Sequence, residues 1–416
     1  MVEKLPNSKT FILKNGTTIV VEEIKNLRTV SIGILVGAGN IYENKNNSGI
    51  SHFIEHMIFK GTKNMSALDI VSKIDGIGGK INAYTSKEFT FFYVIVEDKH
   101  FSTAAQILSD IFLNSLFNEK DIELEKKVIL EEIKLHKDSP ETEIHDIFAQ
   151  TALKNHPLGM PILGTEESIK NISRESIKSY LKSVYLPKNI IISVAGNIKA
   201  KNVLNFFSPI FSKKNESNKK LSSPAIEIKS NCSLKTKNTE QIHFVIGTKG
   251  PMFNDEKKYT YSILDNILGS TMSSRLFQEI REKRGLAYSI QSYLQSFRQT
   301  GLFCIYAGTK KDTFEQTLYL ILEEMKKIKK DGITDEELNR AKESDKGALV
   351  LRLESSKSRM SYLATSQFYF NRIVPVDELT RKIDRIKKED IVELANEIFI
   401  KDYICLSVIG NIKKLP

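Results

Sequence analysis

The chain has 416 residues, 41% hydrophobic and 27% charged, which is enough for two or more domains with ordinary cores. No apolar run reaches the roughly 18 residues of a membrane span, and three cysteines are too few for a disulfide scaffold or a cysteine zinc site. The net charge of +10 comes without a nucleic-acid-binding motif, so a basic nucleic-acid-binding protein is the weakest function considered, and we expect no nucleic acid among the partners.

The first elements expected along the chain are strands and one short helix. Alternating and β-branched residues predict strands at 10–23 and 29–37, with a turn at Asn15 and Gly16 in the first of these stretches. Residues 49–60 have the apolar spacing of an amphipathic helix, for which Ser48 is the expected N-cap. This helix carries the residues on which the functional prediction depends.

Residues 52–56 of the short helix read His-Phe-Ile-Glu-His. His52 and His56 are four residues apart, so both imidazoles project from one face and can reach the same metal ion. Glu55 lies beside them and suits a base that takes a proton from water. The pattern indicates a zinc hydrolase, in which three protein ligands leave one position open for water. The alternative is a pair of hydrogen-bonded core histidines that need no metal.

A third metal ligand is expected from the helix predicted at 119–137, which follows helices at 67–74 and 101–114 and a β-rich segment at 80–97. On this helix one face holds the candidates, which are Glu125, Glu132 and His136.

Glu132 can serve as the ligand, and Glu125 can orient a ligating histidine from behind. His136 competes with Glu132, and a Lys- and Glu-rich helix is more often simply solvated, so the residues alone leave the choice open.

The remaining pattern predicts a helix at 141–153, a strand at 189–195, and a second half with strands near 241–248 and 288–307. Strands and helices mix without a strict strand–helix–strand alternation. This mixture favours an α+β fold over a doubly wound sheet.

The chain contains an internal duplication. Residues 193–199 read SVAGNIK and residues 407–413 read SVIGNIK, and the offset of 214 residues also holds through the preceding helix. We therefore expect two tandem homologous domains, 1–211 and 239–416, each with a mainly antiparallel sheet packed with helices. Residues 212–238 have the Ser-, Asn- and Lys-rich composition of a polar linker.

Six of the seven histidines lie in the first half, and the second half has only His243. The duplicated domain therefore cannot hold an equivalent zinc site. We expect domain 1–211 to be catalytic and zinc-binding, and domain 239–416 to be non-catalytic and to contribute to the substrate cleft.

At these residues the sequence resembles the inverzincins, and more narrowly the pitrilysin family on the branch of the mitochondrial processing peptidase and its bacterial relatives. The resemblance implies that the third ligand is a Glu 76 residues after His56, which selects Glu132 in the segment VILEEIK. It also implies that the acid seven residues earlier, Glu125, belongs to the catalytic centre. One Zn²⁺ per chain is expected, held by His52, His56 and Glu132.

The resemblance extends to two further segments. Residues 78–93 resemble the substrate-binding edge strand of the family, and residues 273–290 resemble a signature of its second domain, where an Arg and a Tyr meet the substrate carbonyl. A Tyr hydroxyl or an Arg at that carbonyl can stabilise the oxyanion. The implied substrate-binding and catalytic residues are Asn82, Ala83, Tyr84, Thr85, Arg281 and Tyr288. Two acids after the zinc helix, Glu141 and Asp146, can pair with basic substrate residues.

We therefore expect a zinc metalloendopeptidase that cleaves unfolded peptides, including basic presequence-like ones, with Glu55 as the general base. The alternative is a non-catalytic peptide-binding or scaffold subunit of the same family. The resemblance also implies a homodimer or a pair with a related chain. No export signal is visible at the N-terminus, which predicts a cytoplasmic protein, or an organelle-matrix protein if a leader was removed.

Overall fold

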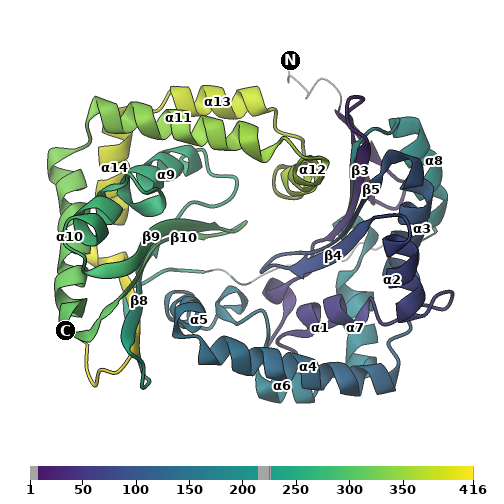
Figure 1. Ribbon diagram of the computed structural model, residues 1–416, viewed down its shortest axis with the longest axis horizontal. Helices are drawn as coiled ribbons and strands as arrows, with labels where there is room; N and C mark the ends of the chain where they lie inside the picture. Colours follow the sequence, from purple (N-terminus) through teal and green to yellow (C-terminus); the bar gives the residue numbers. More distant parts are fainter. Residues whose placement is uncertain (1–7, 214–223, 225, 416) are drawn as a thin grey trace. The chain divides into compact units, whose positions relative to one another are not determined.

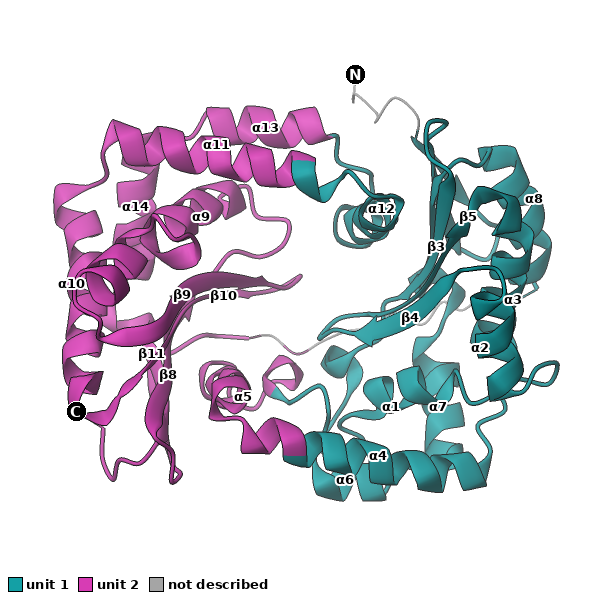
Figure 2. Ribbon diagram, in the orientation of Figure 1, with its two compact units in different colours: residues 1–134, 160–223, 351–375 teal, residues 135–159, 224–350, 376–416 magenta. Residues whose placement is uncertain are grey.

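A computed structural model describes residues 8–213, 224 and 226–415 of the chain (Figure 1). By their contacts the residues divide into two units (Figure 2), here called unit 1 (residues 1–134, 160–223 and 351–375) and unit 2 (residues 135–159, 224–350 and 376–416). Within the described residues, no helix is both long enough and apolar enough to cross a membrane.

Unit 1 is built on a six-stranded sheet with the strand order β1-β2-β6-β3-β5-β4. Only the β2–β6 pair is parallel, and the other four pairs are antiparallel. The β1–β2 hairpin turns at Asn15 and Gly16, as predicted, and Gly16 has a φ of +93°, which glycine adopts readily. The strands are β1 (Ser8–Ile12), β2 (Thr18–Glu23), β3 (Thr29–Val36), β4 (Lys80–Thr85), β5 (Thr90–Glu97) and β6 (Ile190–Gly196).

Both faces of this sheet are covered, because successive residues such as Ile19 and Val20 are both buried and belong to different clusters. Seven helices accompany it up to residue 211: α1 (Ile50–Met57), α2 (Ala67–Asp75), α3 (Phe101–Asn114), α4 (Glu119–Asp138, which crosses the boundary to unit 2), α6 (Glu166–Lys170), α7 (Arg174–Val184) and α8 (Ala200–Phe211). The other face packs against α12 (Ser356–Phe370), whose Met360 and Leu363 are fully buried.

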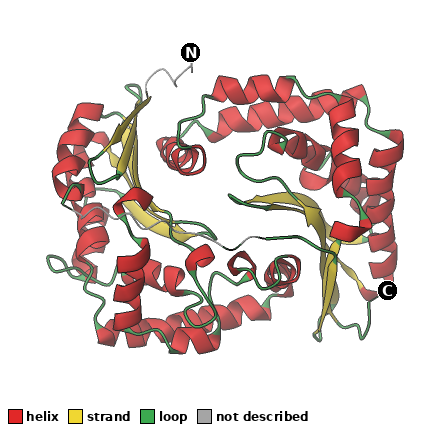
Figure 3. Cartoon of the chain, turned by 180° about the vertical axis from the view of Figure 1, so that it is seen from behind, coloured by secondary structure: helices red, strands yellow, loops and turns green. Residues whose placement is uncertain are grey.

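Unit 2 is built on a five-stranded sheet with the order β7-β11-β8-β10-β9. The β11–β7 pair is parallel and the others are antiparallel. The strands are β7 (Asn231–Thr236), β8 (Gln241–Lys249), β9 (Ala287–Ser296), β10 (Gly301–Lys310) and β11 (Cys405–Gly410). The helices of this unit are α5 (Pro140–Ala152), α9 (Lys258–Asp265), α10 (Phe314–Asp331), α11 (Asp335–Arg352, whose last two residues belong to unit 1), α13 (Val376–Asp384) and α14 (Lys388–Ile398). Figure 3 shows helices on both faces of each sheet.

The two units share one plan, which agrees with the duplication in the sequence. The order β2-β6-β3-β5-β4 in unit 1 corresponds to β7-β11-β8-β10-β9 in unit 2. Helices α7 and α14 begin and end 214 residues apart. The expected α+β fold with two homologous, mainly antiparallel sheets is therefore confirmed.

Each unit borrows a helix from the other half of the sequence (Figure 2). Helix α5 comes from the first half but packs on β7, β8 and β11 of unit 2. Helix α12 comes from the second half but packs on β2, β3 and β6 of unit 1. The domain bounds 1–211 and 239–416 therefore stay a prediction about the duplicated sequence, since the compact units follow different residues.

The predicted linker 212–238 is only partly a linker. Residues 214–223 and 225 lie outside the described residues. Residues Asn231–Thr236 form strand β7, so the prediction was wrong for this stretch. Its polar side chains are those of an edge strand, stabilised by backbone pairing to β11, which composition does not reveal.

Candidate metal centre

Helix α1 presents the residues predicted to bind metal. Its apolar side, with Phe53, Ile54 and Met57, is buried in the core of unit 1. The expected N-cap, Ser48, was wrong, because the N-cap position is Gly49 with a φ of +88° and no side-chain cap. The first backbone N–H groups are bound instead by the carboxylate of Glu43.

Three potential ligand atoms converge between α1 and α4. The Nε2 atoms of His52 and His56 are 3.2 Å apart, and the Glu132 Oε2 lies 3.8 Å from the first and 3.9 Å from the second. A tetrahedral zinc with bonds of about 2.0–2.2 Å needs ligand atoms about 3.3–3.6 Å apart. The Glu132 side chain is 42% exposed, so it has room to turn inward. The donor set therefore fits a zinc ion, although the ligand roles stay a prediction.

The two imidazoles have different surroundings. Burial lowers the pKa of His52 to about 4, so this ring is neutral at pH 7, which is the form that binds metal. His56 Nδ1 lies 2.8 Å from Glu125 Oε1. Burial opposes the charged form of His56, but this hydrogen bond and the Glu125 charge outweigh it, so the pKa of His56 is raised.

Glu125 is almost fully buried and is held by two partners, His56 and Lys60. Lys60 Nζ lies 2.6 Å from Glu125 Oε2. Burial alone would raise the pKa of Glu125, but the hydrogen bonds from His56 and Lys60 outweigh it and the pKa is lowered. This arrangement fixes the His56 ring with its Nε2 facing the other two potential ligands.

Glu55 precedes His56 in helix α1, is half-buried and interacts electrostatically with His56 and Glu132. The Thr85 hydroxyl donates a 2.6 Å hydrogen bond to Glu55 Oε2. Burial raises the pKa of Glu55, and the Thr85 hydrogen bond opposes that shift. A carboxylate with a raised pKa, held beside the ligand cluster, suits a proton acceptor.

The predicted substrate-binding residues of unit 1 lie on β4, at the end of the sheet order, where the strand pairs only with β5. Asn82 and Tyr84 are exposed, and Ala83 and Thr85 are half-buried. The free edge of β4 offers backbone groups to an extended peptide. Binding by Asn82, Ala83, Tyr84 and Thr85 stays a prediction.

The remaining predicted site residues lie in unit 2. The guanidinium carbon of Arg281 is 5.4 Å from the Tyr288 ring centroid, and Tyr288 is 76% exposed. Arg281 lies in the last turn of a π-helical segment, Phe277–Glu282, and lines a cavity of about 220 Å³ that is also lined by Glu141 and Tyr306. The catalytic role of Arg281 and Tyr288 and the substrate-binding role of Glu141 stay predictions.

His136, which competed with Glu132 as the third ligand, lies near Asp146 in unit 2. Asp146 Oδ2 lies 3.6 Å from His136 Nε2. The group of potential ligand atoms within 4.8 Å of one another contains Glu132 and not His136, and it is the single such group among residues 8–213, 224 and 226–415.

Lys60 and the hydrogen bond from Thr85 to Glu55 were not predicted from the sequence. Lys60 lies three residues beyond the end of α1, so the helical pattern did not identify it. Thr85 reaches Glu55 from a strand thirty residues further on, and no local pattern reveals that contact.

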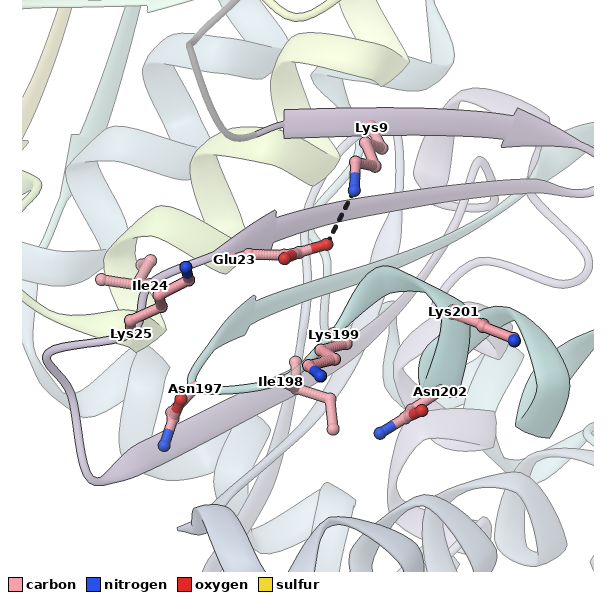
Figure 4. A pocket seen from close by; sticks show the side chains of 9 residues that line it. All are labelled: Lys9, Glu23, Ile24, Lys25, Asn197, Ile198, Lys199, Lys201 and Asn202. Carbon is pink, nitrogen blue, oxygen red and sulfur yellow. Dashed lines mark hydrogen bonds and ion pairs between the residues drawn. The ribbon is translucent and has the colours of Figure 1, made fainter.

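Besides the cavity at Arg281 in unit 2, a cavity of about 770 Å³ lies in unit 1 (Figure 4). It is lined by polar and basic side chains that include Lys9, Lys199 and Asn202, and none of the three potential metal ligands contributes to it. Lys9 donates to Glu23, the acid in its lining. Four lysines and one acid line this cavity, together with two isoleucines and two asparagines.

Comparison with protein families and curated proteins gives consistent matches. Residues 18–166 match the family model described as Insulinase (Peptidase family M16), and residues 171–344 match that described as Peptidase M16 inactive domain. A Bacillus subtilis protein named uncharacterized zinc protease YmxG is 39% identical over 98% of this chain and 99% of its own length. A Streptomyces coelicolor protein named uncharacterized zinc protease SCO5738 is 33% identical over 96% of this chain and 89% of its own.

Two solved structures resemble the whole chain. A protease from Helicobacter pylori has a TM-score of 0.91 and 24% identity, covering 98% of this chain and 100% of its own. A Pseudomonas fluorescens structure described as a peptidase M16 inactive domain also has a TM-score of 0.91, with 18% identity, covering 99% of this chain and 100% of its own. At these identities the likeness concerns the fold alone.

Proposed function

The chain belongs to peptidase family M16, and from this membership we propose that it is a zinc-dependent endopeptidase that cleaves unfolded peptides. The observation that carries the proposal is the convergence of His52, His56 and Glu132, with ligand atoms within 4.8 Å of one another and Glu55 beside them. Curated relatives named zinc proteases support it.

His52, His56 and Glu132 are the proposed ligands of one Zn²⁺ per chain. When bound, a zinc with three protein ligands supplies an open position for water and lowers the pKa of that water to about 7. Glu125 and Lys60 hold His56 in the required orientation. His52 contributes a neutral ring, since burial keeps its pKa near 4.

Glu55 is the proposed general base. The Thr85 hydroxyl donates to Glu55 Oε2 and holds the carboxylate, which is proposed to take a proton from the attacking water. The same carboxyl group then donates that proton to the leaving amine when the peptide bond breaks. The burial that raises the pKa of Glu55 favours this second transfer.

The substrate is proposed to add to the free edge of β4 as an extended strand, next to Asn82, Ala83 and Tyr84. This mode reads the peptide backbone and therefore requires an unfolded segment. Arg281 and Tyr288 are proposed to stabilise the oxyanion on the substrate carbonyl. Glu141 and Asp146 are proposed to favour basic residues near the cut, as in presequence-like peptides.

Two further expectations stay predictions. One is a homodimer or a pair with a related chain, which light scattering with size-exclusion chromatography tests directly. The other is a cytoplasmic location.

A non-catalytic peptide-binding subunit is the second candidate. It is favoured by the match of residues 171–344 to a model described as an inactive domain. That match covers the half in which His243 is the only histidine, whereas Glu55 and the three proposed ligands lie before it. A purely binding subunit needs no oriented base beside a metal, so the endopeptidase is preferred.

The proposal is tested with a quenched-fluorescent library of unstructured peptides, a chelator control and the Glu55→Gln variant. We expect the zinc-loaded protein to cleave and Glu55→Gln to lose 10²-fold or more of kcat/KM, in line with general acid–base catalysis, while keeping its zinc. Glu131→Gln, which changes an exposed carboxylate on α4, is the matched control and should cleave normally. A zinc-loaded wild type without activity on any peptide would favour the non-catalytic subunit.

A further inference from the structure

The carboxylate of Glu43 lies at the start of the helix that carries the proposed catalytic residues. Its Oε2 accepts a 2.7 Å hydrogen bond from the Gly49 N–H and its Oε1 a 3.0 Å hydrogen bond from the Ser51 N–H. Glu43 is 4% exposed. A buried carboxylate at a helix N-terminus satisfies donors that the helix leaves free and interacts favourably with the positive end of its dipole.

The first turn of α1 is fixed on other sides as well. The Ser51 hydroxyl lies 2.8 Å from the Tyr180 hydroxyl, and the Ser168 hydroxyl donates to the Ser48 carbonyl. A Cβ on Gly49 would lie 2.7 Å from the Leu163 carbonyl oxygen. The backbone just before His52 therefore has little freedom to shift.

The two proposed histidine ligands differ in how their rings are held. His56 has a hydrogen bond from Nδ1 to Glu125, the usual way in which a protein orients a metal-binding imidazole. His52 Nδ1 is buried and has no hydrogen-bond partner among the described residues. The His52 ring is therefore oriented by packing and by the backbone that carries it, and this backbone begins with the two N–H groups that Glu43 binds.

We propose that Glu43 is a positioning residue for His52: by binding the N–H groups of Gly49 and Ser51, it sets the first turn of α1 so that His52 Nε2 faces the metal. The inference rests on the proposed zinc-binding function and deepens it. His52 Nδ1 has no hydrogen-bond partner among the described residues, and Glu43 instead fixes the backbone from which the His52 ring projects.

A plain capping role would have a different signature. A lost cap lowers the free energy of unfolding but leaves the folded site unchanged. A lost positioning contact weakens metal binding in the folded protein, typically 10- to 100-fold for groups that orient ligands. Zinc affinity of the folded chain therefore separates the two roles.

The test uses Glu43→Gln in the full chain. Glutamine fills the same space, but its amide group can accept only one of the two N–H hydrogen bonds and presents its own NH₂ to the other. We expect the zinc Kd, measured by competition with a chromophoric chelator, to rise 10- to 100-fold, with far-UV circular dichroism unchanged. Ser66→Ala, which removes the side-chain cap of α2 in the same unit, is the control and should keep the wild-type zinc Kd.

Glu43→Asp keeps the carboxylate on a shorter chain and should give an intermediate zinc Kd, so it provides the measurement if the glutamine variant does not fold. A folded Glu43 variant whose zinc Kd stays within twofold of wild type would overturn the inference. If His52→Ala weakens zinc binding while Glu43→Gln does not, only the role of Glu43 is lost. If the wild type binds no zinc, the proposed function is lost with it.

Discussion

Glu125 acts on the candidate metal centre through His56, while Lys60 in turn holds Glu125. This chain of contacts runs from a half-exposed lysine to a nearly buried carboxylate and then to an imidazole. Removal of the lysine would leave a buried carboxylate with one partner fewer, which raises the pKa of Glu125 and loosens the ring that it orients.

We therefore predict that Lys60→Met raises the zinc Kd about 10-fold and lowers kcat/KM of the zinc-loaded protein. Lys63→Met is the matched control, because Lys63 is exposed and three residues away, and should behave as wild type. The two zinc affinities are measured by chelator competition. Equal affinities for Lys60→Met and Lys63→Met would remove Lys60 from the metal centre.

The sequence predicts the residues of the centre unevenly. His52, Glu55 and His56 stand within one helical turn, so spacing alone brings them together. Glu132 lies on another helix. The residues alone did not distinguish Glu132 from His136 as the third ligand, and only the spacing in the resembling family selected Glu132. The Thr85 hydrogen bond joins residues thirty positions apart, and Glu43 binds the start of α1 from six residues before Gly49, outside the position where an N-cap is expected, so neither contact was predicted.

At the scale of single elements, the start of α1 depends on two glycines in close approach. Gly49 has a φ of +88°, and a Cβ on Gly164 would lie 2.3 Å from the Ser48 carbonyl oxygen. A side chain at Gly49 or at Gly164 therefore forces the backbone that precedes the histidines to move. Gly347, in the interior of α11, has nothing within 4 Å of its Cβ position in the described structure.

We predict that Gly164→Ala lowers the free energy of unfolding by about 1–3 kcal/mol, as overpacking does, and weakens zinc binding. Gly347→Ala should instead raise the free energy of unfolding by about 0.5–1 kcal/mol, since alanine is the better helix former. Chemical denaturation of both variants checks the opposite signs. A Gly164→Ala variant as stable as wild type would mean that the backbone at Ser48 and Gly49, just before α1, can move without cost.

Asp265, at the end of α9, gives unit 2 a pH dependence. Burial raises its pKa to about 7, although Ser292 donates to it from β9, and the nearby Asp345 raises the pKa further. The folded state therefore keeps a proton that the unfolded chain, with a pKa near 3.8, releases. The stability is fully present below pH 4 and falls as the pH rises from about 4 to about 7.

We predict that Asp265→Asn removes this fall, which amounts to about 4 kcal/mol at most for three pH units. The difference in Tm between variant and wild type should be larger at pH 8 than at pH 5. Calorimetry at the two pH values measures it. A Tm difference that does not change with pH would show that Asp265 is ionised in the folded protein as well.

Helix periods predicted several elements to within a residue, such as 101–114 for α3 and 119–137 for α4, because long amphipathic patterns have few alternatives. Strand β7 escaped prediction because its polar residues match a linker and its pairing partner, β11, lies about 170 residues further along the chain. The N-cap of α1 was not predicted because the N–H groups of Gly49 and Ser51 are bound by the carboxylate of Glu43, which lies before the helix, and not by Ser48.

For the whole molecule, the exchange of helices makes each unit depend on both halves of the sequence. In unit 1, Met360 and Leu363 of α12 are fully buried against the sheet, and Arg359 pairs with the buried Glu22 at 2.5 Å. In unit 2, Thr151 of α5 binds the hydroxyls of Ser233 and Ser407. The sequence repeat shows which segments of the two halves are equivalent. It does not show which of the two sheets each helix covers.

We predict that residues 1–223 expressed alone are unstable and bind zinc poorly, because the sheet face under α12 is uncovered. The burial of Met360 and Leu363 alone is worth about 1.5–3 kcal/mol each. Adding residues 224–416 should restore secondary structure and zinc binding, which circular dichroism and metal analysis report. A first fragment that folds fully by itself would contradict the dependence on α12.

The most direct test of the central claim, that His52, His56 and Glu132 hold one zinc ion, compares two neighbouring carboxylates. Zinc stoichiometry and Kd are measured for the wild type, Glu132→Gln and Glu131→Gln. We expect one zinc per chain with wild-type affinity for Glu131→Gln, and a zinc Kd raised at least 100-fold for Glu132→Gln. Wild-type zinc affinity in Glu132→Gln would contradict the central claim.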